Sequence, residues 1–503
     1  MGSSQKIAKG FVWTTIVNII NGIYGFISVP ILIAYFGKSD YGLIGLAMSI
    51  NVYLRLMDMG LSSTNVRFFS NWIAKKEYEK TDKLFQTSLS FYGIVGLLNA
   101  IVLLVVSLFS QQIFNLNPEQ DEIIKHLLYI LAISAFISWL TSCLDQFIRA
   151  NEYIGWTQRV GLLAKLAQIV ILTLTVTLGF SIEAYYALTA FSMFIPIPFL
   201  IGKIKKIASY VHFKLHIDRS IFKEILPYTL NIFSFGLFQF SIINLRPVFL
   251  GMQGSIESVA DYRILNGIIS IVIMLGGAFL SIILPSASKA VATGNVNAQK
   301  QIAYQGTKYI TIALCLFCFG VMSVSNELIT LYVGPDYQYL TIWLDLWLLT
   351  TLATHNQAIS SLILSGADIR AITYTTIASS IIGLIICWFT IPYFEIGGTI
   401  IGYGAYLIIQ LTFFYTYYWP RKMNIDSTRV FLRSFLPATA CGATIALSIK
   451  YLISDVLPDF NTLMDFIIGG LAFCILYIPI VWFVILDKND KRFFLNLVKK
   501  VKK

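Results

Sequence analysis

Fourteen apolar runs, each long enough to cross a lipid bilayer, set the strongest limit on how this chain can fold. A membrane-spanning helix needs about 20 mostly apolar residues. The runs cover residues 11–36, 41–61, 84–110, 123–147, 160–179, 183–202, 225–250, 258–284, 308–333, 340–365, 372–393, 396–419, 431–453 and 462–486. Composition agrees, because 57% of the 503 residues are hydrophobic and only 13% are charged. The sequence therefore predicts an all-α polytopic membrane protein with 14 transmembrane helices.

The six cysteines indicate packing rather than a disulfide framework or a metal site. Almost all of them fall inside apolar runs, away from the outer loops where disulfides form. Cys315 and Cys318 form a CxxC motif, but no second CxxC or histidine pair accompanies it. We therefore expect no metal and no resident cofactor. The basic N-terminus is followed by an apolar run without a small-residue cleavage site, which predicts a retained first helix.

Lysine and arginine residues predict how the runs are oriented. If the N-terminus lies inside and the runs alternate in direction, 30 of the 37 Lys and Arg residues fall in cytoplasmic segments, whereas only Lys38, Lys125 and Lys450 fall near the outer face. One missed helix would reverse the side of every later loop, so the positive-inside rule supports both the count and the orientation. Both termini are then cytoplasmic. The net charge of +11 reflects this topology, and nucleic-acid binding is not implied.

A short internal repeat predicts two lobes. "PILIAYFG" (30–37) and "PVFLGMQG" (247–254) each place six residues between a proline and a glycine. The copies are six runs apart, an even number, so both cross in the same direction, as parallel-related halves of a transporter require. We expect an N-lobe over 1–203, a C-lobe over 204–420, an added helix pair over 421–487 and a basic cytoplasmic tail over 488–503. Pro30 and Pro247 are hinge candidates, because a proline removes a backbone hydrogen bond.

The tail reads "KRFFLNLVKKVKK" and is amphipathic and basic. This pattern favours an interfacial anchor on the anionic inner leaflet. A binding site for a regulatory partner is the alternative.

Two segments resemble a known family. "GFISVPILIAYFGKSDYGLIGLAMSI" (25–50), followed by "LMDMGLSSTNVRFF" (56–69), resembles the opening of polysaccharide and oligosaccharide flippases, the O-antigen (Wzx-type) branch of the multidrug/oligosaccharidyl-lipid/polysaccharide (MOP) exporter superfamily. "INLRPVFLGMQGSIESVADYRI" (243–264) resembles their seventh-helix region. The length of the chain, its fourteen runs and its basic tail extend the likeness along the whole chain. Members of the family often carry an acidic residue beside a basic one near the end of helix 7. This chain has Asn244, Leu245 and Arg246 there, which puts an acidic coupling role at this spot in doubt.

The resemblance implies a MATE/MOP-like fold and transport rather than catalysis. It implies a carrier that moves a polyprenyl-pyrophosphate-linked oligosaccharide from the inner to the outer leaflet by alternating access, in the biosynthesis of a surface polysaccharide such as O-antigen or capsule. It also implies residence in a bacterial inner membrane, with the lipid bilayer and the lipid-linked glycan as partners. A glycan-assembly polymerase is a further implied partner.

Four cationic side chains lie within the predicted spans: Arg55, Lys165, Arg246 and Arg263. Each costs at least about 2.5 kcal/mol at the bilayer centre unless it meets a partner, a hydrated cavity or the interface. Arg246 and Lys165 lie near enough to helix ends to snorkel. Arg263 could pair with Asp261 in a loop, and Arg55 with Asp58 on the same helix. Alternatively, the four line a hydrated cationic lumen that binds a diphosphate, since guanidinium groups pair well with phosphate oxygens.

Polar residues at membrane depth are candidates for sugar contact and for energy coupling. Side-chain amides could hydrogen-bond sugar hydroxyls or join helices to one another, and they are Asn18, Asn21, Asn99, Asn231, Gln239, Asn244 and Asn266. Coupling needs a titratable or ion-binding group that the two conformations expose differently, and the candidates are Asp58, Asp345 and His355. His355 is the only histidine at depth, which ranks proton coupling a little above sodium coupling. A neutral, hydrogen-bonded imidazole is the alternative.

Three other classes of protein compete with a polysaccharide flippase. A membrane glycan polymerase would normally carry a large outer loop, whereas the longest outer connection here is about 12 residues and no nucleotide loop or paired-carboxylate motif is present. A multidrug exporter of the same superfamily is expected to have twelve spans and an acidic cavity. A peptidoglycan-precursor flippase shares the fourteen spans, so only the sugar specificity separates it from a polysaccharide flippase.

Overall fold

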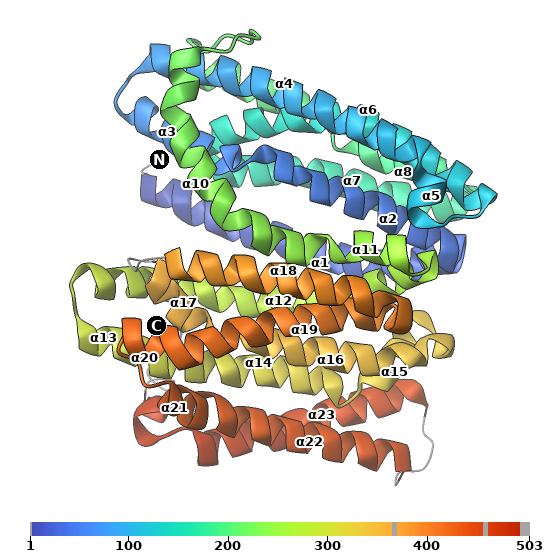
Figure 1. Cartoon of the computed structure of the whole chain (residues 1–503), viewed down its shortest axis with the longest axis vertical. Helices are drawn as coiled ribbons and strands as arrows, with labels where there is room; N and C mark the ends of the chain where they lie inside the picture. The colour runs from blue at the N-terminus through green and yellow to red at the C-terminus, as the bar shows by residue number, and fades with distance from the viewer. Residues whose placement is uncertain (1–2, 365–369, 456–460, 493–503) are drawn as a thin grey trace. The chain divides into compact units, whose positions relative to one another are not determined.

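The computed structural model describes residues 3–364, 370–455 and 461–492, and all regular secondary structure in these ranges is helical (Figure 1). The predicted all-α class is therefore confirmed. Contacts divide the chain into two compact units. Unit 1 holds Met1–Arg263 and Trp388–Thr399, and unit 2 holds Ile264–Cys387 and Ile400–Lys503.

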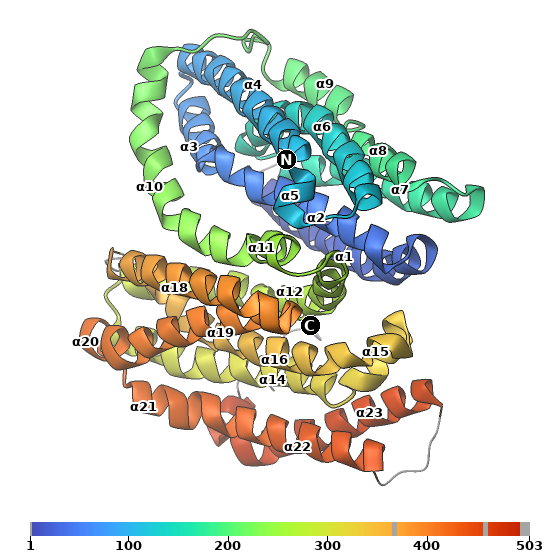
Figure 2. The same cartoon turned by 45° about the vertical axis from the view of Figure 1, so that its right-hand side comes forward.

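Unit 1 contains the helices of the N-terminal half. Figure 2 shows two of its long helices, α4 and α6, packed side by side. Its elements are α1 (Ser3–Phe36), α2 (Lys38–Leu54), the 3₁₀-helix η1 (Arg55–Asp58), α3 (Leu61–Ala74), α4 (Tyr78–Leu108), α5 (Ser110–Phe114), α6 (Pro118–Ala150), α7 (Ile154–Leu178), α8 (Ile182–Ser192), α9 (Ile197–Ile207), α10 (Arg219–Asn244), α11 (Arg246–Gln253), the first part of α12 (Ile256–Ala292), the end of α18 (Arg370–Phe394) and the start of α19 (Ile396–Phe413).

Local sequence signals determine where α6 and α2 begin. The Asn117 side chain accepts a hydrogen bond from the backbone N–H of Gln120 (2.8 Å), and the Gln120 side chain accepts one from the backbone N–H of Asn117 (3.3 Å). This reciprocal capping box, with Pro118 in the first turn, satisfies two backbone N–H groups at the start of α6. Gly37, at the junction of α1 and α2, has a φ of 86°, which a residue without a side chain adopts at the least cost.

The core of unit 1 is aromatic and lies among α3, α4 and α6. Phe147 meets Phe69 at 5.1 Å and Phe85 at 5.4 Å, both edge to face, and all three rings are fully buried. Lipid tails are as apolar as such a core, so helices in a bilayer associate through close packing and hydrogen bonds. The rings therefore fix α3, α4 and α6 relative to one another.

Unit 2 contains the remaining helices, several of which are interrupted by 3₁₀ or π turns. Its elements are the rest of α12, α13 (Val296–Gln301), η2 (Ile302–Gly306), α14 (Thr307–Met322), α15 (Ser325–Val333), η3 (Pro335–Leu340), α16 (Thr341–Thr351), η4 (Leu352–Asn356), α17 (Gln357–Leu364), most of α18 (Arg370–Phe394), most of α19 (Ile396–Phe413), η5 (Phe414–Tyr418), α20 (Trp419–Lys422), α21 (Ser427–Arg429), η6 (Val430–Phe435), α22 (Leu436–Asp455), α23 (Thr462–Ile480) and η7 (Val481–Ile485).

A buried ion pair fastens the segment after η7 to the start of α14. Lys308 Nζ lies 2.6 Å from Asp490 Oδ2, and the Tyr309 hydroxyl donates to Asp490 Oδ1 at 2.7 Å. Asp490 is only 1% exposed. Burial raises the pKa of this carboxyl, but the hydrogen bonds from Lys308 and Tyr309 outweigh burial, so its pKa lies below the usual range. The residues of the predicted tail from 493 to 503 lie outside the described part of the chain.

Each of the fourteen predicted runs coincides with helical segments, but the count of fourteen crossings stays a prediction. Within the described residues, ten helices are long and apolar enough to cross a bilayer. An eleventh is added if the two pieces of α10, bent by 46° between Ser234 and Gly236, count as one span. Of the other runs, 41–61 forms an α2 of only 17 residues, and 340–365 is divided among α16, η4 and α17.

The two copies of the predicted repeat, each with its hinge candidate, have different local structures. Gly37 and Gly254 both lie at a junction between helices. Pro247 stands in the first turn of α11, directly after the break at Leu245, whereas Pro30 lies inside the uninterrupted α1. Only Pro247 therefore coincides with a helix break, and the hinge roles stay predictions. The lobe boundaries at 203 and 420 also stay predictions, since the compact units are divided within α12, α18 and α19.

Candidate functional site

A polar cavity of about 290 Å³ lies within unit 1, among α2, η1, α3, α4 and α6. Most of its walls are hydroxyl, amide or charged side chains. The residues that line it are Asn51, Arg55, Asp58, Ser62, Asn99, Ala135, Ser138, Trp139 and Ser142. Such a set in a bundle of apolar helices provides both hydrogen-bond donors and acceptors at membrane depth. Ionisable residues at this depth, here Arg55 and Asp58, are candidates for a functional site.

Asp58 is held on one side of this cavity by neutral donors. Its Oδ1 accepts hydrogen bonds from the Ser62 hydroxyl (2.7 Å) and the Tyr92 hydroxyl (2.6 Å), and its Oδ2 accepts one from the Ser62 backbone N–H (3.1 Å). Gln146 donates through Nε2 to both hydroxyl groups at 2.9 Å. Asn65 donates to Gln146 Oε1 at 2.8 Å. We call these five residues the Asp58 network.

Arg55 does not form the intrahelical ion pair expected with Asp58. Within the described residues no carboxylate lies within 4 Å of the Arg55 guanidinium, and the side chain is exposed at the cavity. The physical reason is that Asp58 already accepts three hydrogen bonds from Ser62 and Tyr92. A guanidinium exposed within a bundle of membrane helices requires water or an anionic or polar ligand beside it.

Arg263 connects α12 to α2 rather than pairing with its neighbour Asp261. Its Nη2 donates to the carbonyl of Gly45 (2.8 Å) and to the Ser49 hydroxyl (2.9 Å). Lys38 lies 2.8 Å from Asp261, so that carboxylate has a different cation than expected.

The approach of α2 to α12 also depends on glycine. A Cβ atom on Gly42 would lie 2.2 Å from the carbonyl oxygen of Ile256. No side chain fits at that distance, so a residue without one is required. The contact and the bonds of Arg263 together indicate a tight junction of the two helices inside unit 1.

Arg246 and Lys165 lie in separate surroundings. Arg246 is only 3% exposed, and its guanidinium carbon lies 5.6 Å from the centre of the Tyr262 ring. Lys165 donates to Gln168 Oε1 at 2.7 Å and lies 4.3 Å from the centre of the Tyr24 ring. Neither residue lines the polar cavity. Of the four predicted cations, Arg55 alone is therefore placed at this cavity.

The predicted amide candidates are scattered. Asn18, Asn21 and Gln239 are exposed, and Asn266 is half-buried in unit 2. Asn244 donates to the Phe240 carbonyl of its own helix at 2.9 Å. The side chain of Asn231 lies outside the described residues. Asn99 is the one member of the set that lines the polar cavity.

Two of the coupling candidates, Asp345 and His355, lie in unit 2 and are bonded to other residues there. Asp345 Oδ2 lies 2.6 Å from Lys450 Nζ, which also donates to the Ser325 hydroxyl at 2.9 Å. This pair connects α16 to α22. His355 is buried, with Nδ1 2.8 Å from the Leu352 carbonyl and Nε2 2.8 Å from the Tyr415 hydroxyl. A carbonyl only accepts, so Nδ1 carries the proton, and a neutral ring can accept at Nε2.

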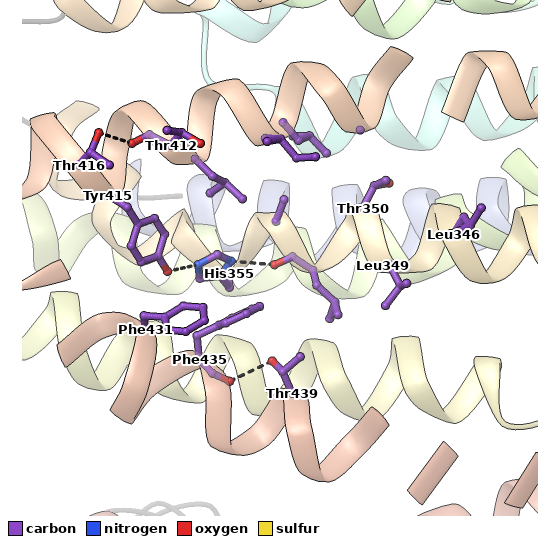
Figure 3. A pocket seen from close by; sticks show the side chains of 16 residues that line it. Leu346, Leu349, Thr350, His355, Thr412, Tyr415, Thr416, Phe431, Phe435 and Thr439 are labelled. Atoms are coloured by element: carbon purple, nitrogen blue, oxygen red, sulfur yellow. Dashed lines mark hydrogen bonds between the residues drawn. The ribbon is translucent and has the colours of Figure 1, made fainter. Parts of the chain in front are cut away.

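His355 and Tyr415 also line an apolar cavity of about 700 Å³ in unit 2. Figure 3 shows Phe431 and Phe435 on one side of the imidazole and leucines of α16 farther along the wall. Most of the polar groups there bond to one another or to their own helices, for example Thr416 to the Thr412 carbonyl at 2.6 Å. This cavity offers mainly hydrocarbon surface and suits an apolar ligand.

Sequence reasoning did not single out Asn51, Ser138, Trp139 or Ser142 as site residues. A signal was present, because Ser138 and Ser142 are four residues apart and share one face of α6. Hydroxyl groups also pair with their own helix in membrane segments, so this spacing alone does not separate a site from a structural role.

Comparisons with known proteins agree on the kind of fold. The family profile described as polysaccharide biosynthesis protein matches residues 7–291. A solved structure titled "Lipid II flippase MurJ, inward closed conformation" is 16% identical, with a TM-score of 0.69 and coverage of 95% of this chain and 99% of that chain. An inward-facing multidrug resistance MATE family transporter of the MOP superfamily is 17% identical, with a TM-score of 0.64 and coverage of 87% and 99%.

A structure of the MATE multidrug transporter DinF-BH is 14% identical, with a TM-score of 0.54 and coverage of 82% of this chain and 95% of that chain. No curated protein sequence gives a significant match. At such low identities the structural likeness shows the fold alone, and it confirms the expected MATE/MOP-like fold.

Proposed function

Because this chain belongs to the polysaccharide biosynthesis protein family, whose profile covers more than half of it, we propose that it is a flippase for a lipid-linked oligosaccharide. The substrate is a polyprenyl-pyrophosphate-linked glycan repeat unit, which it moves from the inner to the outer leaflet of a bacterial inner membrane by alternating access. The product feeds the assembly of a surface polysaccharide such as O-antigen or capsule, with a glycan-assembly polymerase as the next partner.

The observation that carries this proposal is the family match over residues 7–291, which contains all of the residues that line the polar cavity. A flippase must offer a hydrated route to a large polar headgroup in a chain that otherwise faces lipid. The polar cavity of unit 1 and the exposed Arg55 supply such chemistry. The apolar cavity of unit 2 suits the hydrocarbon part of the same lipid.

Arg55 is the first candidate for contact with the headgroup, because a guanidinium without a carboxylate partner among the described residues is available to oxygen atoms of the substrate. Arg246, Arg263 and Lys165 remain proposed contacts of the transport pathway. A peptidoglycan-precursor flippase and a multidrug exporter are the competing functions, since both occur among the structural neighbours. A lipid-linked glycan ranks above a drug here because the cavity in unit 1 combines a cation with many neutral hydrogen-bonding groups.

For energy coupling we propose protons ahead of sodium, with Asp58 as the first candidate. Among Asp58, Asp345 and His355, only Asp58 lines a polar cavity. Asp345 already has Lys450 as a partner, and both ring nitrogens of His355 are bonded. Transport in vesicles that responds to an imposed proton gradient supports this ranking, whereas a sodium requirement reverses it.

The test of the proposed function replaces Arg55 in the native host. Arg55→Ala should abolish the surface polysaccharide and cause lipid-linked repeat units to accumulate inside, with a normal amount of protein in the membrane. Arg219→Ala is the matched control, because Arg219 is exposed at the start of α10 and lines neither cavity. Normal polysaccharide in cells that lack the whole protein would contradict the proposal. Arrest of peptidoglycan synthesis, or drug sensitivity with intact polysaccharide, would favour one of the competing functions.

A further inference from the structure

We propose that the polar cavity of unit 1 is a subsite for one sugar ring. This inference rests on the proposed function and deepens it, because it assigns a part of the glycan to a particular place in the chain. The chemistry of the walls, one buried amide oxygen and the volume of the cavity support it.

The walls match the functional groups of a sugar ring. A pyranose carries several hydroxyls, each of which donates and accepts, and two faces of C–H groups that lie well on an aromatic ring. The cavity offers donors and acceptors from Asn51 and Ser138 and a guanidinium from Arg55. Ser142 offers an acceptor oxygen, because its hydroxyl donates to the Ser138 carbonyl at 3.1 Å. Trp139 supplies the aromatic surface. Its indole is stacked on Tyr92, with ring centres 5.7 Å apart and an angle of 21°, so it is fixed in place.

The Asn99 side chain points to a bound hydroxyl group. Asn99 is only 1% exposed, and within the described residues its Oδ1 has no hydrogen-bond partner. Buried amide oxygens are almost always satisfied, because leaving one without a donor costs free energy. Asn99 lines the cavity from α4, so a donor placed in the cavity would satisfy it. Ligand hydroxyls are donors of this kind.

Volume and charge argue against the other classes of ligand. About 290 Å³ lies at the low end for small-molecule pockets, so one ring fits and a drug-sized molecule does not. A diphosphate is disfavoured, because its negative charge would lie beside the Asp58 carboxylate and Arg55 is the one cation in the lining. A metal ion is disfavoured, because the positive guanidinium of Arg55 would repel it. The described residues also hold no cluster of three or more His, Cys, Asp or Glu side chains suited to a metal.

The experiment measures monosaccharide binding to the full chain in lipid nanodiscs by ligand-observed NMR. The probes are glucose, N-acetylglucosamine and glucuronate, with inorganic pyrophosphate as a separate arm. We expect at least one sugar to bind and pyrophosphate to leave its signals unchanged. Asn99→Leu and Ser138→Val should each weaken the binding about tenfold, the effect of removing one or two hydrogen bonds.

Ser134→Val is the matched control. Ser134 lies one turn before Ser138 on α6, is buried, and donates to the carbonyl of Leu131 in its own helix at 3.1 Å. Binding by this variant should equal that of the unchanged protein. Ser138 is exposed, so its replacement leaves the packing of α6 intact and remains informative if Asn99→Leu does not fold.

Absence of binding by all three sugars overturns the subsite, as does equal binding by Asn99→Leu, Ser138→Val and the control. Binding of pyrophosphate in place of sugar overturns it as well. Export of polysaccharide in the host separates this inference from the proposed function. If export depends on the protein while no sugar binds the cavity, the subsite fails and the flippase stands. If export does not depend on the protein, the flippase proposal fails and the subsite falls with it.

Discussion

Replacing Lys450 by methionine would leave the Asp345 carboxylate buried without its cation. At an effective dielectric constant near 20, charges separated by the observed 2.6 Å attract by about 6 kcal/mol before the cost of desolvation. Removing one partner of a fully buried pair costs about 3 to 5 kcal/mol. The Lys450 side chain is 34% exposed, so water replaces part of the lost interaction. We therefore expect Lys450→Met to lower the free energy of unfolding by about 2 to 3 kcal/mol.

The double variant Asp345→Leu with Lys450→Met should recover most of this loss, because no uncompensated charge remains. Reversible unfolding in bicelles measures the free energies of the two single variants and the double variant. Polysaccharide export is measured for the same three proteins. We expect the double variant to export normally, since the pair acts by holding α16 to α22.

Two results would refute this reasoning about Asp345. A loss of less than about 0.5 kcal/mol in Lys450→Met, within the range of exposed ion pairs, would show that the pair contributes little. A stable double variant without export would show that Asp345 acts in transport rather than in structure.

Three further predictions concern packing, pH and topology. Gly42→Ala should destabilise unit 1 by about 1 to 3 kcal/mol through overpacking, whereas Gly25→Ala, with nothing within 4 Å of the added carbon, should not destabilise it; thermal unfolding compares the two. Folding lowers the pKa of Asp490, so its ion pair should stabilise the protein above the ordinary carboxyl pKa. This stabilisation should be lost as the pH falls through the lowered pKa, and the free energy of unfolding measured from about pH 6 down to about pH 3 tests the expected decrease. With the native cysteines removed, Glu119→Cys should react with an impermeant thiol reagent from outside and Lys75→Cys should not; the reverse pattern would invert the topology.

Much of the fold could be predicted because apolar length and basic loops are local properties of the sequence. Each apolar run became helix, and the family resemblance led to the fold that the comparisons confirm. The breaks within the helices were harder to predict. The interruption at Leu245 follows from Pro247, but the 3₁₀ segment η4 in the run 340–365 depends on tertiary packing that a hydropathy pattern does not encode.

The candidate site could be predicted only in part, because burial cost identifies a charge but not its partner. Arg55 and Asp58 were both expected at membrane depth, yet their pairing was wrong, since Tyr92 and Ser62 from other turns reach Asp58 first. Arg263 was expected beside Asp261 and instead bonds to α2. Ser138 became a wall of the cavity only once α6 was placed beside α4. Apart from Ser62, these partners are distant in sequence, and only the folded chain shows them.

The Asp58 network limits how this chain can change during evolution. Asp58, Ser62, Tyr92, Gln146 and Asn65 each satisfy a neighbour, so an exchange at one position strands a polar atom at the next. Homologues should therefore carry either the whole set or a wholly different one, and chimaeras that join α3 of one homologue to α6 of another should insert poorly unless both come from the same set.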